Sequence, residues 1–182
     1  ISDYFFQIKP LKKENIILSV GRFDQIMNAK KQDFLVEVFK EMVDKGLNNW
    51  QLVLVGGLMK DNAFFHKLKE ASSGYPIKIL SNVDFQILIN YYKKSKIYWH
   101  AAGYGEDLSL HPKRAEHFGI SIVEAVVSGA FPLVYKQGGP AEIIQDENSL
   151  WVTKQELMKK TNYLVNNSKP IEPRLRVLRN NF

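Results

Sequence analysis

The run LVLV at 52–55 is apolar at every position and is stopped by Gly56-Gly57. A strand that is apolar on both faces is typical of a parallel sheet with helices covering both sides. Parallel neighbours need long crossover connections, which are usually helices. This run therefore predicts an α/β domain.

The rest of the chain alternates strand and helix, as such a sheet requires. Further strands are predicted at 16–20, 77–80, 97–99, 131–135 and 150–152. Helices are predicted from Phe34 to a cap at Gly46, at 61–72, after a cap at Asp84, and at 119–128, 140–145, 154–166 and 172–181. Because crossovers between parallel strands are right-handed, the pattern predicts a single domain with a doubly wound parallel sheet. We expect a linker at 1–13, the sheet domain at 14–153 and a helical tail at 154–182.

Composition limits the classes of function. The 25 Lys+Arg against 19 Asp+Glu give a net charge of +6, which suits a phosphate-bearing ligand, an anionic membrane surface or nucleic acid; a solvated basic surface is the alternative. The absence of cysteine excludes disulfides and thiolate chemistry and fits a reducing, cytoplasmic compartment. No apolar run approaches the roughly 18 residues of a membrane span. Because the chain begins at Ile1 rather than Met, we expect it to be a piece of a longer polypeptide.

Ligands of doubly wound sheets bind at the carboxyl ends of the strands, and cations follow the first strand here. Gly21-Arg22 ends that strand, and Lys30-Lys31 stand just before the next helix. A helix N-terminus prefers anions, so these cations make sense if they converge on a bound phosphate. The alternative is a set of ordinary surface cations. Neither a GxxxxGK[ST] loop nor a GxGxxG fingerprint is present.

Two carboxylates flank the start of the helix at 119–128. Phe118-Gly119-Ile120 would offer free backbone N–H groups to an anion. On one regular helix, Glu116 and Glu124 would be about 12 Å and about 80° apart. If Glu116 instead precedes the helix, both can face different points of one elongated ligand. The alternative is that Glu116 is a helix-start acid and Glu124 a paired surface acid.

Other residues allow two interpretations each. Gly138-Gly139-Pro140, before Glu142, is either a second backbone cradle or a plain turn. His100, at a strand end, is either a donor to a polar ligand or a histidine of the core or rim. No metal is expected, because His111, Glu116 and His117 lack helical ligand spacing.

Two further partner classes are weighed. The basic residues lack the aromatic interleaving of a nucleic-acid surface, so no nucleic acid is expected. The cations at 169–179 predict a solvated helix face, with peripheral contact to an anionic membrane as the alternative.

Motifs in a fixed order carry a resemblance. The segments GRF, KKQDFL, LVGG, EHFG…EA and GGPAE follow one another, and seven residues separate Glu116 from Glu124. Over about 14–153, the chain resembles the C-terminal, Rossmann-like donor-binding domain of family-4 (group 1) retaining glycosyltransferases of the two-domain GT-B type. The EHFG motif and the longer loop before it are most similar to a branch of this family that contains a lipid-linked oligosaccharide mannosyltransferase.

The resemblance implies residue roles. Arg22 and Lys30, beside Gly21, would hold the donor diphosphate and stabilise the leaving group, with Lys31 as the alternative register. Glu116 would contact the hydroxyls of the donor sugar, and His100 would line the same site.

It also implies roles further along the donor. The backbone at Phe118, Gly119 and Ile120 would meet the phosphates, and Glu124 would bind the ribose hydroxyls. Val83, in the turn after the strand at 77–80, would line the base. Gly138, Gly139 and Glu142 match a motif near the donor pocket and the domain hinge.

The implied reaction transfers a hexose from a UDP-, GDP- or ADP-sugar to a glycan or lipid-linked acceptor with retention, without a cofactor or a protein-bound metal. Retention without a protein nucleophile implies attack on the face that the leaving group vacates. The acceptor would be held mainly by an N-terminal domain that this chain lacks. We therefore expect the fragment to bind nucleotide but not to turn over. The loop at 103–115 is additional to the family pattern.

Two other hypotheses compete. A nucleotide-sugar epimerase or a glycosidase is one, and a glycosidase needs two carboxylates about 5–9.5 Å apart across the bond. A non-catalytic interaction module on the same fold is the other.

Overall fold

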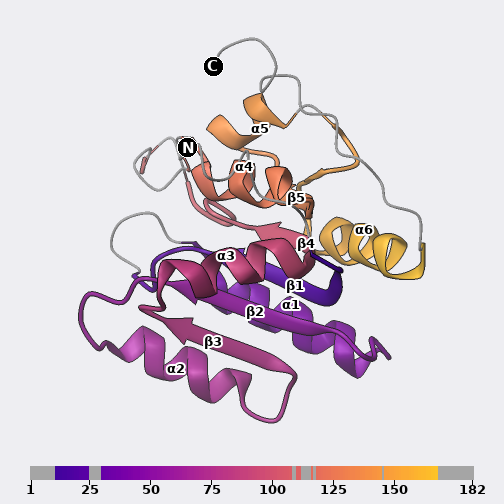
Figure 1. Cartoon of the computed structure of the whole chain (residues 1–182). Coiled ribbons are helices and arrows are strands. Elements are labelled where there is room, and N and C mark those ends of the chain that lie inside the picture. Colours follow the sequence, from indigo (N-terminus) through magenta and orange to yellow (C-terminus); the bar gives the residue numbers. More distant parts are fainter. Residues whose placement is uncertain are drawn as a thin grey trace.

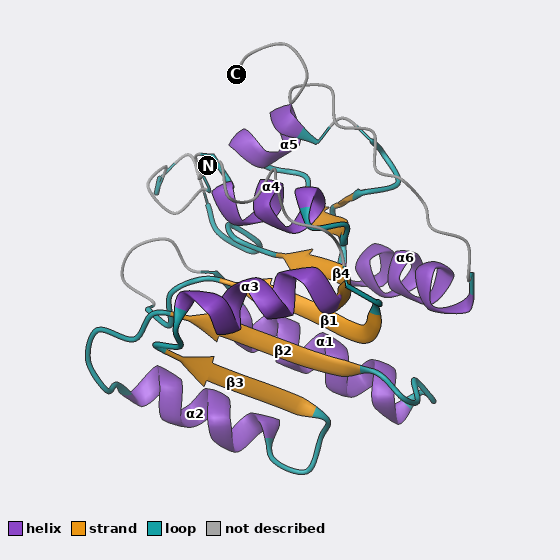
Figure 2. Ribbon diagram, viewed as in Figure 1, coloured by secondary structure: helices purple, strands orange, loops and turns teal. Residues whose placement is uncertain are grey.

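A computed structural model of the chain describes residues 11–24, 30–107, 110–111, 116, 118–144 and 146–167. These residues form a six-stranded sheet in the order β3-β2-β1-β4-β5-β6, and every neighbouring pair is parallel (Figures 1 and 2). The strands are β1 (Glu14–Val20), β2 (Gln51–Gly56), β3 (Ile77–Ser81), β4 (Ser95–His100), β5 (Phe131–Tyr135) and β6 (Leu150–Trp151). The helices are α1 (Gln32–Asp44), α2 (Ala63–Ser72), α3 (Phe85–Lys94), α4 (Ile120–Val127), α5 (Gly139–Ile143) and α6 (Lys154–Asn166). The doubly wound α/β fold predicted from the sequence is confirmed.

The strand order reverses direction between β1 and β4. The chain first builds the sheet outward from β1 to β3, then returns to place β4 on the other side of β1. Loops leave the carboxyl ends of β1 and β4 toward opposite faces at such a point, so a crevice forms between them. The order therefore marks where a ligand would bind.

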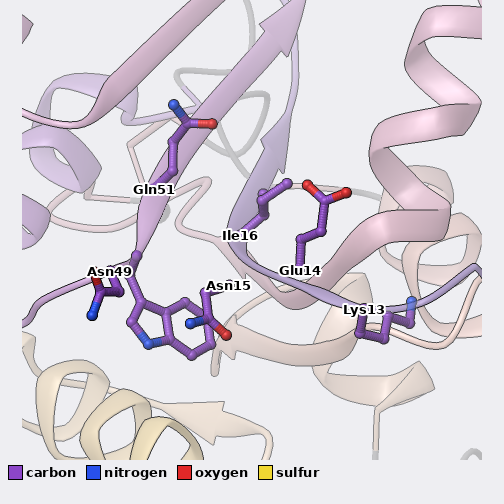
Figure 3. Close-up of a pocket in the computed structure, with 7 residues that line it drawn as sticks. Lys13, Glu14, Asn15, Ile16, Asn49 and Gln51 are labelled. Atoms are coloured by element: carbon purple, nitrogen blue, oxygen red, sulfur yellow. The ribbon is translucent and has the colours of Figure 1, made fainter.

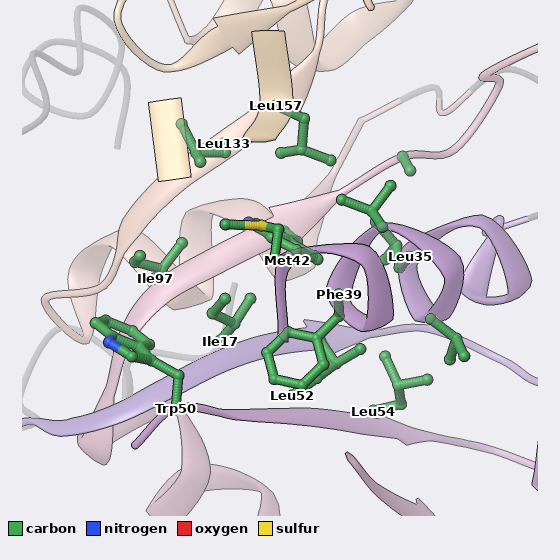
Figure 4. Packing of buried hydrophobic residues seen from close by; sticks show 14 of the residues in the cluster. Ile17, Leu35, Phe39, Met42, Trp50, Leu52, Leu54, Ile97, Leu133 and Leu157 are labelled. Carbon is green, nitrogen blue, oxygen red and sulfur yellow. The ribbon is translucent and has the colours of Figure 1, made fainter. Parts of the chain in front are cut away.

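The strands bury side chains on both faces. Leu52 and Leu54 pack in one cluster with residues of α1, α2 and α6, and Figure 4 shows Leu52 and Leu54 beside Phe39 of α1. Val53 and Val55 pack in a second cluster with residues of α3 and α4. The prediction of a strand apolar on both faces is confirmed, because successive side chains of a strand point to opposite sides.

Helix α6 belongs to the packed domain. Leu157 is fully buried, and the indole Nε1 of Trp99 on β4 donates to Thr161 Oγ1 at 3.1 Å. The domain boundary expected after residue 153 therefore does not separate α6 from the sheet, because its apolar side completes the core. The expected helix at 172–181 and most of the linker at 1–13 lie outside the described residues.

Most expected helix ends are confirmed, with one correction. Gly46 follows α1 with φ +102° and donates to Val43 O at 2.9 Å, as a C-terminal cap does. Asp84 occupies the N-cap position of α3, but its side chain makes no capping hydrogen bond. A residue of suitable type at the right place is thus not always a functional cap. In the described part of the chain no helix combines the length and apolar character needed to cross a membrane.

Candidate functional site

Glu116 is the centre of a polar cluster at the switch point. Lys30, just before α1, forms an ion pair with Glu116 Oε2. His100, the last residue of β4, has its Nε2 3.4 Å from the same oxygen. The backbone N–H of Gly119 donates to Glu116 Oε1 at 3.3 Å. Groups from three separate segments therefore hold one carboxylate at the carboxyl ends of β1 and β4.

The surroundings of Glu116 and His100 determine their charges. Burial raises the pKa of Glu116, but the hydrogen bonds from His100 and Lys30 and their charges outweigh it, so the pKa lies well below its usual range. Burial lowers the pKa of His100, and Glu116 opposes that only in part. At neutral pH Glu116 is therefore ionised and His100 neutral. With the imidazole proton on Nε2, the ring donates to Glu116 and leaves the buried Nδ1 without a partner among the described residues.

Gly21 allows Lys30 to reach Glu116. A Cβ at Gly21 would lie 2.7 Å from Lys30 Cγ, so the lysine side chain passes directly over this residue. Gln32, the first residue of α1, is buried and its Nε2 donates to the carbonyl oxygens of Gly21 at 3.3 Å and Arg22 at 2.9 Å. The turn after β1 is thus fastened to the start of α1.

The neighbouring cations have other surroundings. Lys31 is paired with Glu106, in the segment that follows β4, and so ties that segment to α1. Arg22 is exposed and lines a hollow of about 370 Å³ with Gly57, Met59 and others on the side of β2 and α2. The structure therefore brings Lys30, and neither Arg22 nor Lys31, to Glu116. The convergence of Arg22 and Lys30 on one phosphate stays a prediction.

Two glycine turns meet at the start of α4. Gly119 is the N-cap residue with φ +69°, and a Cβ there would lie 3.2 Å from Pro140 Cγ. The N–H of Gly139 donates to the carbonyl oxygen of Glu116 at 3.1 Å. Gly138 has φ +75° and caps α5. The glycines predicted as two separate cradles therefore form one contiguous surface.

Three other predicted residues lie on or near this surface. Phe118 and Ile120 are half exposed, with 54% and 50% of their surface accessible, so their side chains do not cover the helix start. Glu142 is exposed on α5. Contact of any of these with a phosphate or a sugar stays a prediction.

Glu116 precedes α4, whereas Glu124 lies within it. The two carboxylates are therefore not on one helix, as the hypothesis of an elongated ligand requires. The hydroxyl of Tyr92, on α3, donates to Glu124 Oε2 at 2.9 Å. Burial raises the pKa of Glu124, and the hydrogen bond from Tyr92 opposes this.

Val83, the expected base contact, follows β3 and is partly buried against the second core cluster. In the sheet order, β2 and β1 lie between β3 and β4. The cluster around Glu116 therefore does not include Val83, and its contact with a base stays a prediction.

Sequence reasoning missed the tyrosines behind the site. The hydroxyl of Tyr98, fully buried on β4, lies within hydrogen-bonding distance of Ser121 Oγ at 2.8 Å and of Val20 O at 3.3 Å. Tyr92 lies in the helix predicted after Asp84, but no role was predicted for it. A buried tyrosine carries a hydroxyl that needs a hydrogen-bond partner, which a leucine at the same position would not. A tyrosine at a predicted core position was therefore the sequence signal for these polar contacts.

Another hollow lies at the opposite ends of the strands, where β1 and β2 begin. It has a volume of about 480 Å³ and is lined by the residues that begin β1 and β2, among them Lys13, Asn15 and Trp50 (Figure 3). None of the predicted site residues lines it. In the described segments no group of three or more His, Asp or Glu side chains is arranged to hold a metal ion.

Comparison with known proteins identifies a family whose model matches this chain. A family model described as "Glycosyl transferases group 1" matches residues 1–181. A GDP-Man:Man(3)GlcNAc(2)-PP-Dol alpha-1,2-mannosyltransferase of Dictyostelium discoideum is 30% identical over 75% of this chain and 27% of its own length. A glycogen synthase of Hydrogenovibrio crunogenus is 27% identical over 69% of this chain and 23% of its own length.

Solved structures share the fold. A crystal structure of S. aureus TarM in complex with Fondaparinux, alpha-GlcNAc-glycerol and UDP matches 88% of this chain and 30% of its own, with a TM-score of 0.63 and 18% identity. At that identity the likeness concerns the fold alone. The chain spans about a quarter of the length of the curated relatives that it matches.

Proposed function

The chain belongs to the group 1 glycosyltransferases, and from this membership we propose that it binds the nucleoside diphosphate of a sugar donor. In a longer enzyme it would support transfer of a hexose, with retention, to a glycan or lipid-linked acceptor. Two relatives support the kind of donor, since the name of one includes GDP-Man and the other was crystallised with UDP. The glycosidase and epimerase hypotheses are disfavoured, because the matching family and the relatives are transferases.

The observation that carries the proposal is the cluster of Lys30, His100 and Gly119 around Glu116. It lies at the switch point between β1 and β4, where ligands of such sheets bind. Its carboxylate is ionised and can accept hydrogen bonds from sugar hydroxyls. Its lysine stands beside the positive N-terminal end of α4. The cluster thus offers an acceptor for a sugar and positive charge for a diphosphate, side by side.

This arrangement suits the departure of a diphosphate. As the bond from the sugar to the leaving oxygen breaks, negative charge builds on the phosphates. Lys30, Arg22 and the backbone N–H groups at the start of α4 would stabilise that charge through preorganised electrostatics. Lys30 is already paired with Glu116, so it would be shared between the carboxylate and the phosphate. For retention we propose attack by the acceptor on the face that the leaving group vacates, without a covalent intermediate on the protein.

The acceptor and the cell location are also proposals. The PP-Dol in the name of the Dictyostelium relative supports a lipid-linked acceptor. The net charge of +6 supports peripheral contact of such an enzyme with the cytoplasmic face of a membrane. Because the chain spans about a quarter of that relative, we propose that the acceptor site and the other wall of the donor cleft belong to a further domain.

Calorimetric titration with UDP, GDP and ADP tests the donor site. We expect at least one of them to bind the unchanged chain. Lys30→Ala and Arg22→Ala should each weaken that binding by about 10- to 150-fold, because a charge-assisted hydrogen bond contributes about 1.5–3 kcal/mol. Lys67→Ala is the matched control, since Lys67 is an exposed cation on α2, and it should leave the affinity unchanged.

Two results would contradict the proposal. If no nucleoside diphosphate binds at millimolar concentration, the donor-site assignment fails and the non-catalytic module is favoured. If Lys67→Ala weakens binding as much as Lys30→Ala, the site owes its affinity to general positive charge instead.

A further inference from the structure

We propose that Tyr92 is a positioning residue for nucleoside recognition. Its hydroxyl holds the Glu124 carboxylate in the orientation that accepts hydrogen bonds from the ribose hydroxyls of a nucleoside diphosphate. This inference rests on the proposed function and adds a residue that does not itself touch the ligand.

The contact joins two helices. Tyr92 is completely buried on α3, and its hydroxyl donates to Glu124 Oε2 on α4 at 2.9 Å. Glu124 is only partly buried, so the tyrosine lies on the protein side of the carboxylate and solvent on the other. The tyrosine hydroxyl therefore anchors the carboxylate at Oε2, and the side of the carboxylate that faces solvent can meet a ligand.

Anchoring matters because a glutamate is flexible. Fixing a long side chain costs up to about 2 kcal/mol in lost rotamer freedom. Where the fold has already restricted the side chain, a ligand need not supply that cost on binding. Tyr92 can act in this way because its buried ring has no freedom to follow the carboxylate outward.

A second tyrosine, Tyr98, packs against Tyr92 and restricts its position. The rings of Tyr92 and Tyr98 stack with centroids 6.3 Å apart at 28°. The hydroxyl of Tyr98 bonds Ser121 in the first turn of α4 and Val20 at the end of β1. The tyrosine pair thus fixes Glu124 relative to both sides of the switch point.

The electrostatics agree with this role. Burial raises the pKa of Glu124, which favours the protonated acid, and the hydrogen bond from Tyr92 opposes that shift. An ionised carboxylate is an acceptor only, which is what two ribose hydroxyl donors require.

The test compares two ligands on Tyr92→Phe, which removes the hydroxyl and keeps the ring. Titration with UDP or GDP should show about a five- to tenfold loss of affinity, less than the loss of a hydrogen bond to a charged group, because Tyr92 acts on the ligand only through Glu124. The matching 2′,3′-dideoxynucleoside diphosphate lacks the ribose hydroxyls. Its affinity should change by less than about twofold, because the oriented carboxylate has nothing to bind.

Two further variants sharpen the result. Tyr91→Phe removes a hydroxyl from the neighbouring, partly exposed position of α3 and should change neither affinity. In a Glu124→Gln background, Tyr92→Phe should add no further loss for UDP or GDP, since residues that act through one another are not additive.

The outcomes separate the two proposals. An equal loss for both ligands would assign Tyr92 a structural role and overturn the inference, as would unchanged affinity in Tyr92→Phe. In either case the proposed donor binding still stands. If the unchanged chain binds none of UDP, GDP and ADP, the proposed function and this inference fall together.

Discussion

Glu116 shows how one residue depends on distant segments. Its carboxylate is paired with Lys30, which lies 86 positions earlier in the chain, and with His100 at the end of β4. The sequence left His100 as either a donor to a polar ligand or a histidine of the core or rim. In the structure the imidazole is buried and contacts the carboxylate, and a contact of His100 with a ligand stays a prediction.

His100 makes the fold sensitive to acid. Its folded pKa lies below the ordinary value of 6.5 because burial disfavours the imidazolium. As the pH falls below about 6.5 the unfolded chain takes up this proton and the folded chain does not, so stability falls by at most about 1.4 kcal/mol per pH unit. Glu116 acts with the same sign at lower pH, because its folded pKa is also depressed. Urea unfolding between pH 8 and pH 5 would measure this loss.

His100→Gln isolates the contribution of the imidazole. The glutamine amide can still donate to Glu116 but does not titrate, so stability between pH 6.5 and pH 5 should fall less steeply than in the unchanged chain. Equal slopes for His100→Gln and the unchanged chain would show that another group controls the acid sensitivity.

At the scale of elements, the start of α4 depends on one backbone conformation. Gly119 has φ +69°, and a Cβ there would lie 2.8 Å from Ile122 Cδ1 as well as against Pro140. Gly119→Ala combines a left-handed residue, which costs about 1–2 kcal/mol, with overpacking of about 1–3 kcal/mol. We expect a total loss of about 2–5 kcal/mol in the free energy of urea unfolding, together with weaker nucleotide binding.

Gly74→Ala is the matched control for this change. Gly74 has a similar φ of +79°, but nothing lies within 4 Å of a Cβ built there. It should therefore lose only the conformational part, about 1–2 kcal/mol. If both variants lose the same amount, the contact of Gly119 with Ile122 and Pro140 does not constrain the helix start.

At the scale of the molecule, the candidate site lies at the carboxyl ends of the central strands β1 and β4. Its residues come from β4 and from the loops that follow β1 and β4, whereas the hollow of about 480 Å³ lies at the amino ends of β1 and β2. The core between these ends is formed on both faces of the sheet by helices. The sheet thus carries the candidate site at the carboxyl ends of its strands, and we propose that the acceptor is held elsewhere.

We expect the chain of 182 residues to bind a nucleoside diphosphate without transferring a sugar. Transfer needs the acceptor held in attack geometry, and orientation of that kind contributes about 7–11 kcal/mol in well-ordered reactions. A radiolabelled UDP- or GDP-sugar, incubated with the chain and with candidate glycan or lipid-linked acceptors, should give no product above the buffer control. Turnover by this chain would show that it holds the acceptor itself.

Several features follow from the sequence alone. The apolar runs and the helical spacing at 34–43 predicted the strands and helices, because alternation and the period of 3.6 are local properties of the chain. The family also followed from short motifs in a fixed order. The missing side-chain cap at Asp84 and the packing of α6 against the sheet were not predicted for the same reason, since both depend on a contact and not on a residue type.

The side-chain partners were decided only by the tertiary structure. Lys30 rather than Lys31 meets Glu116, Lys31 meets Glu106, and Tyr92 meets Glu124. Each contact joins segments 32 or more positions apart, and the pairing of Lys30 with Glu116 exists because the sheet order places β1 beside β4. Local periodicity carries no information about which strands become neighbours. The sequence could therefore indicate the candidate site residues but not which of them contact one another.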